Sequence, residues 1–414
     1  MGPGIFPLDE ELELLPGALT PRLVESAVRV GTEIASFARA AELLAFFTGV
    51  RVDEATVRRW TETAGAVVVE RETAELERLE RDCPEGPAGP PLLQGSVDGA
   101  QVPVVGGEWA EVKTLAVGPV ETSRGADGEP VVRTRELSYF SRLTDHETFR
   151  RQAWPELHRR GLETAEQVVW LADGSEWCPG FGLYHREEAV FILDFGHAAE
   201  HLAAAAQATF GAQTLAATDW LTRQCHELKH GDPANVLAAL LTLPTARALD
   251  PAGAAETARA TFEYLAKRWE QIQYAEFLAR GLPIGSGSVE SANKLVIEAR
   301  LKGSGMHWAR HHVSPLAALR ATLCSGRWAA VWPALEAGLR ARQRAAQAQR
   351  RARRVAARAP CSPAAAAPAA TPPAPTAPAP PRPPTRPKKV VNGRPTPDHP
   401  WRRSNSRFFT PRAS

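Results

Sequence analysis

Apolar residues recur at helical spacing over most of the chain and give way to short apolar runs between residues 92 and 194. In the N-terminal part, Gly49 ends one helical pattern and Asp53 is a suitable N-cap for a second. The residues expected to face inward are Ala40, Leu43, Leu44, Phe47, Val57 and Trp60. This pattern predicts a helical, helix-turn-helix-like region over residues 1–85, followed by a Pro- and Gly-rich linker.

The short apolar runs predict five strands with one intervening helix over residues 145–160. The runs are Leu92 to Val97, Trp109 to Val117, Val131 to Leu143, Val168 to Ala172 and Val190 to Leu193. Three meandering strands, a helix and two further strands suit an α/β fold with a mixed sheet flanked by helices. Residues 90–200 would form the first part of this core, with Asp98, Asp173 and Asp194 following strands. Ligands gather at the carboxyl ends of strands in such sheets.

Residues 201–280 are alanine-rich and helical in pattern, which predicts an all-helical insertion into the core. Residues 281–335 complete the core, with a Gly- and Ser-rich loop leading into a helix near Val289. The expected inward face of that helix is Val289, Ala292, Val296 and Ala299. Glu290 lies on the first turn outside this face, one turn before Lys294. Residues 336–358 read as a basic helix, and residues 359–414 as a disordered, basic, Ala- and Pro-rich tail.

Charge is divided unevenly along the chain. The formal net charge is +2, but the stretch from Arg340 onward carries 17 Lys and Arg against one acid, so it holds +16 and the rest −14. A basic tail on an acidic body suggests a nucleic acid partner. The five cysteines have no CxxC pairing, and there is neither a signal-peptide pattern nor a long apolar run. We therefore expect a soluble cytoplasmic protein without a membrane segment.

Three carboxylates are candidates for metal chemistry. Asp98, Asp173 and Glu290 would come from a strand, a strand end and a late helix. Oxygen ligands without His or Cys suit two Mg²⁺ or Mn²⁺ ions, which serve phosphodiester chemistry. Taken singly, each has an ordinary explanation, because Asp-Gly pairs mark turns and a first-turn Glu complements the helix dipole.

These three carboxylates lie within longer sequence motifs. The stretches SVDGAQVPVVGGEWAEVKTLAVG, LADGSEWCPGF, ILDFGHAAEHL and GLPIGSGSVESANKLVIEARLKGSGMHWAR resemble the DDE transposases of bacterial insertion sequences, in particular the ISKra-type group. The resemblance runs from about Phe6 to Trp332, and PTPDHPWR near the C-terminus matches as well. Relatives often begin with a cysteine-rich, zinc-ribbon-like segment, which is missing upstream of this match, so recognition of the element ends is an open point.

The resemblance implies a ribonuclease H-like core with an inserted helical domain. It further implies Mg²⁺-dependent cleavage at insertion-sequence ends and strand transfer into target DNA, with Asp98, Asp173 and Glu290 as the catalytic, metal-binding residues. Asp194 and His197 match an Asp-x-x-His signature expected to support the site, although His197 is equally well explained as a structural histidine. The implied partner is double-stranded DNA, held by a homodimer or larger assembly in the bacterial nucleoid.

Residues expected to contact DNA fall in two groups. Thr56, Arg58 and Arg59 would lie outward on the second N-terminal helix, where a recognition helix contacts phosphates and bases. The second group surrounds Glu290 and comprises Lys294, Arg300, Lys302 and Arg310 for phosphates and Trp308 for an unpaired base. The alternative for Trp308 is core packing beside Met306, and the N-terminal pair also suits an ordinary helical hairpin.

Two other functions remain open. His197-Ala-Ala-Glu200-His201 matches the His-x-x-Glu-His zinc-peptidase motif, in which both histidines share a helix face and the glutamate is the base. The chain would alternatively be an inactive or truncated transposase remnant that only binds DNA. Binding of zinc would indicate the peptidase and not a transposase. DNA cleavage would exclude the inactive remnant.

Overall fold

A computed structural model describes residues 20–124, 130–175, 177–285 and 287–358. The chain divides into two units, Met1–Val355 and Ala356–Ser414. The tail predicted over residues 359–414 lies outside the described residues. Within the described residues, no helix combines the length and apolarity needed to cross a bilayer.

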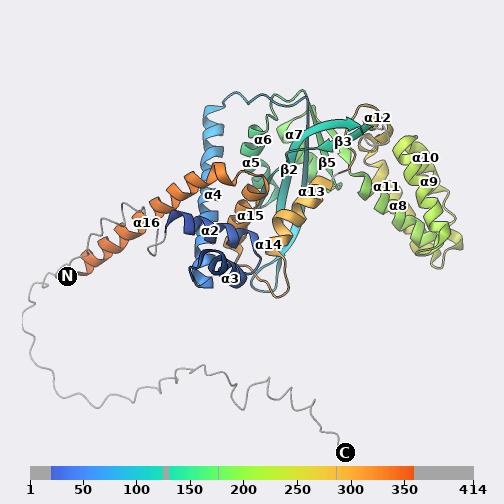
Figure 1. The fold of residues 1–414 in the computed structure, drawn as a ribbon. Helices are drawn as coiled ribbons and strands as arrows, with labels where there is room; N and C mark the ends of the chain where they lie inside the picture. The colour runs from blue at the N-terminus through green and yellow to red at the C-terminus, as the bar shows by residue number, and fades with distance from the viewer. Residues whose placement is uncertain (1–19, 125–129, 176, 286, 359–414) are drawn as a thin grey trace, which may run out of the picture. The chain divides into compact units, whose positions relative to one another are not determined.

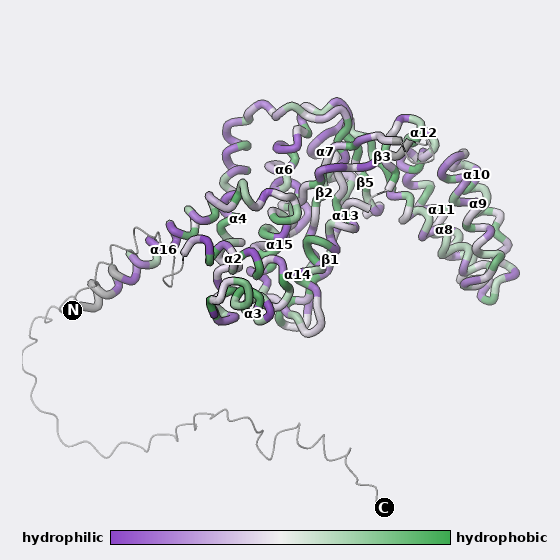
Figure 2. Tube along the Cα trace, in the orientation of Figure 1, coloured by the Kyte–Doolittle hydropathy of each residue, from purple (hydrophilic) through white to green (hydrophobic). Residues whose placement is uncertain are grey.

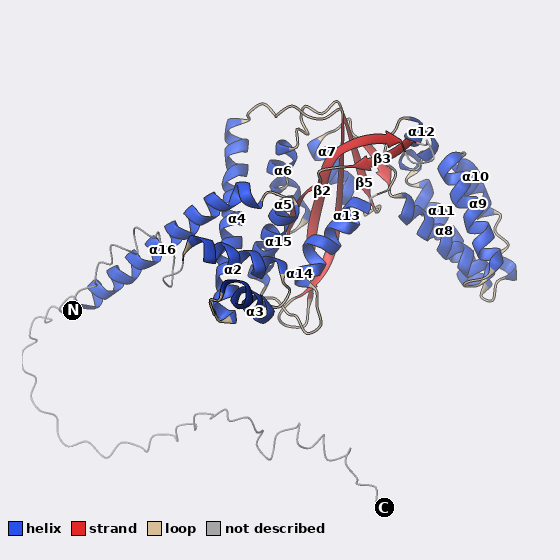
Figure 3. Cartoon of the chain, in the orientation of Figure 1, coloured by secondary structure: helices blue, strands red, loops and turns tan. Residues whose placement is uncertain are grey.

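A mixed six-stranded sheet forms the centre of the fold (Figures 1 and 3). Its strands are β1 (Leu92–Pro103), β2 (Trp109–Arg124), β3 (Pro130–Thr134), β4 (Ser138–Arg142), β5 (Gln167–Ala172) and β6 (Val190–Leu193). The order is β3-β2-β1-β5-β6, and β4 also pairs with β2. The first strands pair antiparallel, whereas β5 pairs in parallel with both β1 and β6. The predicted α/β class with a mixed sheet flanked by helices is confirmed.

Helices cover the sheet on both faces. One core packs β1, β2 and β5 against α5 (His146–Gln152), α6 (Trp154–Arg159) and α7 (Trp177–His185). The other joins β1 and β2 to the N-terminal helices and to the late helices. The latter are α13 (Gly287–Ala292), the π-helical η3 (Asn293–Glu298), α14 (Ala299–Leu301), α15 (Arg310–Cys324) and α16 (Trp328–Arg358). Figure 2 shows hydrophobic residues along β1 and hydrophilic residues along the coloured part of α16.

The predictions for these strands and the helices between them need four corrections. β1 runs to Pro103, so Asp98 lies within a strand and not at its end. The single strand expected over Val131 to Leu143 is divided into β3 and β4, because the chain turns at Glu136, whose φ is 44°. The helix expected over residues 145–160 is two helices, with Pro155 in the first turn of the second. The helix α7 between β5 and β6 was not predicted.

The N-terminal region consists of α2 (Pro21–Glu33), α3 (Phe37–Thr48) and α4 (Glu54–Asp82). Gly49 closes α3 with a φ of 71°, and Asp53 caps α4 by accepting from the Thr56 amide at 2.7 Å, as predicted. α4 then continues as one helix far beyond a usual recognition helix. Gly65 lets α4 pack closely on α15, since a side chain there would meet the Pro315 carbonyl at 2.3 Å. The helix pair therefore packs on the sheet domain as part of one core.

A bundle of helices follows β6, as predicted. Its helices are α8 (Phe195–Phe210), α9 (Leu215–His230), α10 (Pro233–Leu241), η1 (Thr245–Arg247), α11 (Pro251–Ala266), η2 (Trp269–Gln271) and α12 (Tyr274–Ala279). Breaks fall at the expected Asp-Pro pairs, where Asp232 and Asp250 cap the next helix. The bundle shares its core with β5 and β6, so it is fixed beside the ends of these strands.

Candidate active site

The registers of the parallel strands place three aspartates in one row. β1 pairs with β5 through Ser96 and Leu171, and β5 pairs with β6 through Ala172 and Leu193. Continuing these registers by one or two residues aligns Asp98 with Asp173 and Asp173 with Asp194. Because β5 and β6 end at this level, the row lies where parallel strands present their carboxyl ends.

Asp98 is held by two donors. Its carboxylate accepts the Gly99 amide at 2.6 Å and the Asn293 side-chain amide at 2.7 Å. Burial raises the pKa of Asp98, and the nearby charge of Asp173 adds to the rise, whereas the two donors oppose it. Burial and the charge of Asp173 therefore disfavour the charged form of Asp98. This is the environment in which a bound cation is most stabilising.

Asp173 begins a turn beyond β5. Its carboxylate accepts the Ser175 amide at 2.9 Å and the Ser175 hydroxyl at 2.8 Å. The helical insertion reaches the same turn, because the Tyr264 hydroxyl donates to the Asp173 carbonyl at 2.8 Å and Arg268 donates to the Gly174 carbonyl at 2.5 Å. The insertion therefore fixes the backbone that carries Asp173.

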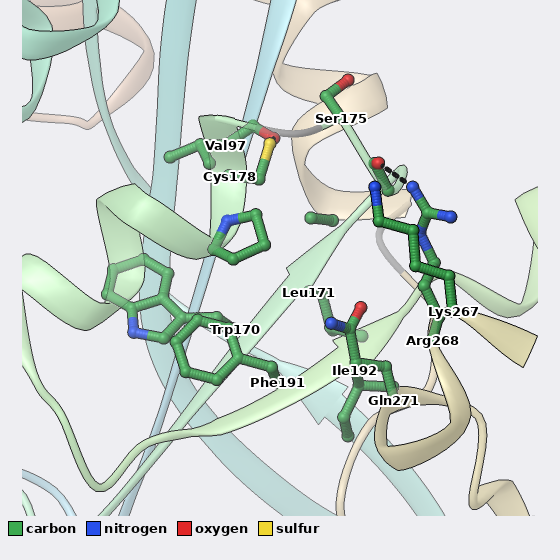
Figure 4. A pocket seen from close by; sticks show the side chains of 13 residues that line it. Val97, Trp170, Leu171, Ser175, Cys178, Phe191, Ile192, Lys267, Arg268 and Gln271 are labelled. Atoms are coloured by element: carbon green, nitrogen blue, oxygen red, sulfur yellow. Dashed lines mark hydrogen bonds between the residues drawn. The ribbon is translucent and has the colours of Figure 1, made fainter. Parts of the chain in front are cut away.

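A cavity of about 170 Å³ adjoins this turn. Figure 4 shows Trp170 and Phe191 on one side and Lys267 and Arg268, from the end of α11 onward, on the other. Buried Cys178 also borders it, and burial raises the pKa of this thiol. The insertion thus brings cationic groups close to Asp173.

Asp194 and His197 form a local capping pair. Asp194 is 7% exposed and caps α8, with its Oδ1 accepting the His197 amide at 2.9 Å and lying 3.2 Å from the His197 Nδ1. The Tyr274 hydroxyl donates to the Leu193 carbonyl at 2.9 Å and further fixes this strand end. The pair therefore fixes the start of α8 beside Asp98 and Asp173.

Glu290 does not join the two aspartates in this structure. Its side chain is 64% exposed and pairs with Lys294 at 2.5 Å. Among the described residues, no group of three or more His, Cys, Asp or Glu side chains is arranged to hold a metal ion. The position that does reach Asp98 from the late helix is Asn293, one turn further along.

Asn293 is a site residue that the sequence analysis missed. It is 5% exposed, and its Oδ1 has no hydrogen-bond partner among the described residues. The signal was present, since Asn293 is a polar residue within the otherwise apolar stripe of Val289, Ala292 and Val296, all of which are buried as predicted. A buried polar residue on an apolar face needs a partner, and here the partner is Asp98.

The π-helical turn overturns two of the predicted DNA contacts. It adds a residue to the turn, so Ala299 lies exposed and Arg300 enters the core with 0% exposure. Arg300 donates to the Gly31 and Ala35 carbonyls at 2.9 and 3.0 Å. Trp308 is also buried, and its indole donates to the Leu301 carbonyl at 2.9 Å, so the core-packing alternative holds for it.

The other predicted DNA contacts remain on the surface. Lys294, Lys302 and Arg310 are exposed, and the two lysines form ion pairs with glutamates one turn earlier. Thr56 and Arg59 line a cleft between α4 and α16. Arg58 lies apart from them, close enough to His312 of α15 to lower the pKa of that imidazole, after the larger effect of burial.

The zinc-peptidase motif is not assembled as a metal site. The His201 ring stacks on Tyr264 with 3.7 Å between ring centroids, and Glu200 is exposed on the helix surface. Within the described ranges no third ligand completes a group with these histidines.

No protein-family model matches the sequence, and no curated protein matches it at a significant level.

Proposed function

We propose that the chain is a DDE-type DNA transposase that cleaves insertion-sequence ends and transfers the strands into target DNA. The observation that carries the proposal is the row of Asp98 and Asp173 on adjacent parallel strands, with Asn293 of a late helix bonded to Asp98. The strand order β3-β2-β1-β5-β6, with antiparallel and then parallel pairing, is compatible with a ribonuclease H-like core. In this proposal the helical bundle between β6 and α13 would correspond to the inserted domain.

The residues present fit a hard divalent cation. Asp98 and Asp173 provide carboxylate oxygens, and the partnerless Oδ1 of Asn293 is an acceptor suited to a water molecule of a hydrated ion. Glu290 would complete the set after leaving Lys294, at small cost since exposed ion pairs contribute about 0–1 kcal/mol. When bound there, two Mg²⁺ or Mn²⁺ ions supply activation of an attacking hydroxyl and stabilisation of the leaving oxygen.

The remaining residues have positioning roles in this proposal. Gly99 and Asn293 orient the Asp98 carboxylate, and Ser175 orients that of Asp173. Tyr264 and Arg268 hold the turn that carries Asp173, so the insertion sets the spacing of the two carboxylates. Lys294, Lys302 and Arg310 are exposed and would contact DNA phosphates in this proposal.

We expect Glu290→Gln to abolish Mg²⁺-dependent cleavage of a plasmid carrying the candidate element ends. Glu298→Gln is a matched control, because Glu298 also pairs with a lysine four residues later, Lys302, at 2.8 Å. Full cleavage by Glu290→Gln would exclude Glu290 from the metal site and leave Asn293 as the contribution of the late helix.

We also expect Asn293→Ala to raise the Mg²⁺ concentration needed for half-maximal cleavage by about 10- to 100-fold, as is typical when a residue that orients a metal ligand is removed. The hydrogen bond from the Asn293 side-chain amide to Asp98 would be lost, while DNA binding would be unchanged. Asn235→Ala serves as the control, since Asn235 bonds to Glu227 on the surface of the insertion. An unaltered Mg²⁺ dependence in Asn293→Ala would contradict the positioning role.

The exposed position of Glu290 favours one alternative, a transposase remnant that binds DNA without cleaving it. Cleavage by the unaltered chain would exclude this. A homodimer or larger assembly on DNA belongs to the proposal as well, because two element ends must be held together.

A further inference from the structure

A cleft of about 780 Å³ lies between the beginning of α4 and the middle of α16. One wall is formed by Thr56, Arg59 and Thr63, which follow each other at helical spacing on α4. The other is a matching stripe on α16, with Leu339, Arg342, Gln343, Ala346, Gln347 and Arg350. Buried Val24 and Trp60 form part of the floor. The cleft is remote in sequence from the candidate carboxylates.

The rim of this cleft is strongly cationic. Four arginines line it, Arg51, Arg59, Arg342 and Arg350, and no acidic residue does. Arg342 forms an ion pair with Glu70 outside the lining, whereas Arg51, Arg59 and Arg350 are exposed. Four guanidinium groups around one opening repel one another, and a polyanion would relieve this repulsion.

We propose that this cleft binds the phosphodiester backbone of double-stranded DNA. Arginine, threonine and glutamine side chains are among those that donate hydrogen bonds to DNA phosphates. The cleft presents its arginines together with Thr63, Gln343 and Gln347 as neutral donors. The wall on α4 begins directly after the turn at Gly49, so its first turns are presented as in helix-turn-helix proteins. Arg351, Arg353 and Arg354 follow Arg350 in the sequence with no acid among them, which adds to the positive charge of this part of the chain.

The inference rests on the proposed function for the identity of the polyanion. It adds the residues of α16 to the DNA contacts that were predicted on the N-terminal helix pair. The test is binding of the full-length chain to a short random-sequence duplex by fluorescence anisotropy at several KCl concentrations. The cleft variant is Arg59→Gln/Arg350→Gln, which spares the Arg342 ion pair. The control is Arg223→Gln/Arg247→Gln, which removes the same charge from exposed positions of the helical insertion.

We expect the cleft variant to bind about tenfold more weakly and to lose roughly 2 from the slope of log K against log [salt], since each phosphate contact contributes about 0.9. The control should retain the unaltered slope. Gln347→Lys, which adds a cation to the lining, should bind more tightly and raise the slope by about 0.9. Equal losses in the cleft variant and the control would overturn the inference.

Two further results separate the possible failures. Normal binding by Asp98→Asn combined with no cleavage by any chain would count against the proposed catalysis and leave the cleft assignment standing. Loss of oligoglutamate binding in the cleft variant, with unchanged duplex binding, would show that the cleft takes an acidic peptide and would overturn the DNA assignment. Thermal melting of each variant confirms that the fold is intact.

Discussion

Replacing Asp98 with asparagine is expected to bring Mg²⁺-dependent DNA cleavage and strand transfer to background while leaving the fold and DNA binding intact. The change removes a formal charge and one strong oxygen ligand but keeps the size of the side chain. The fold should tolerate it, because the charged Asp98 is disfavoured by burial and by Asp173, as its raised pKa indicates. The assay is donor-plasmid cleavage and joining with Mg²⁺, using DNA that flanks the gene as candidate ends.

A matched control for this experiment is Asp219→Asn, since Asp219 is exposed on α9 in the helical insertion. It should cleave and join as the unaltered chain does. Full activity in Asp98→Asn would remove the metal assignment. Absence of activity in both, and in the unaltered chain, with DNA still bound, would make the DNA-binding remnant the leading function.

Replacing Arg300 with methionine is expected to lower the free energy of unfolding by about 2–4 kcal/mol, because buried carbonyls that lose a partner cost about 1–3 kcal/mol each. The affected carbonyls are those of Gly31 and Ala35, at the end of α2 and just beyond it. The guanidinium also lies over the rings of Phe37 and Trp308, at 4.4 and 5.1 Å from their centroids. Its burial is costly, as the lowering of the Arg300 pKa to about 10 shows, and one of its nitrogens has no partner among the described residues.

The measurement is equilibrium unfolding in urea, with Arg310→Met as the control. Arg310 belongs to the same predicted set of DNA contacts but is exposed, so its replacement should change stability by less than about 0.5 kcal/mol. Equal stability of the two variants would contradict the structural role of Arg300. DNA affinity measured in parallel should fall only for Arg310→Met if the surface around Glu290 contacts phosphates.

Periodicity predicted most elements of this fold. The strands that carry Asp173 and Asp194 end as expected, and the helical insertion breaks at its Asp-Pro pairs, because these features depend on local burial patterns and backbone chemistry. The helical hairpin was predicted for the same reason, with Gly49 and Asp53 at its turn. Apolar spacing and capping residues determine local structure within a few residues, so the sequence alone is enough to predict these features.

The sequence by itself determined that Asp173 and Asp194 follow the parallel strands β5 and β6, and it singled out Asp98 as a third candidate although β1 continues beyond it. Only the tertiary structure decided that Asn293 contacts Asp98, that Glu290 stays apart from Asp98 and Asp173, and that Arg300 enters the core. The burial of Arg300 follows from the π-helical turn over Asn293–Glu298, which packs against β1 and α15 and whose hydrogen bonds span one residue more than α-helical ones. A helical wheel assumes a constant period, so a single added residue redirects every side chain beyond it.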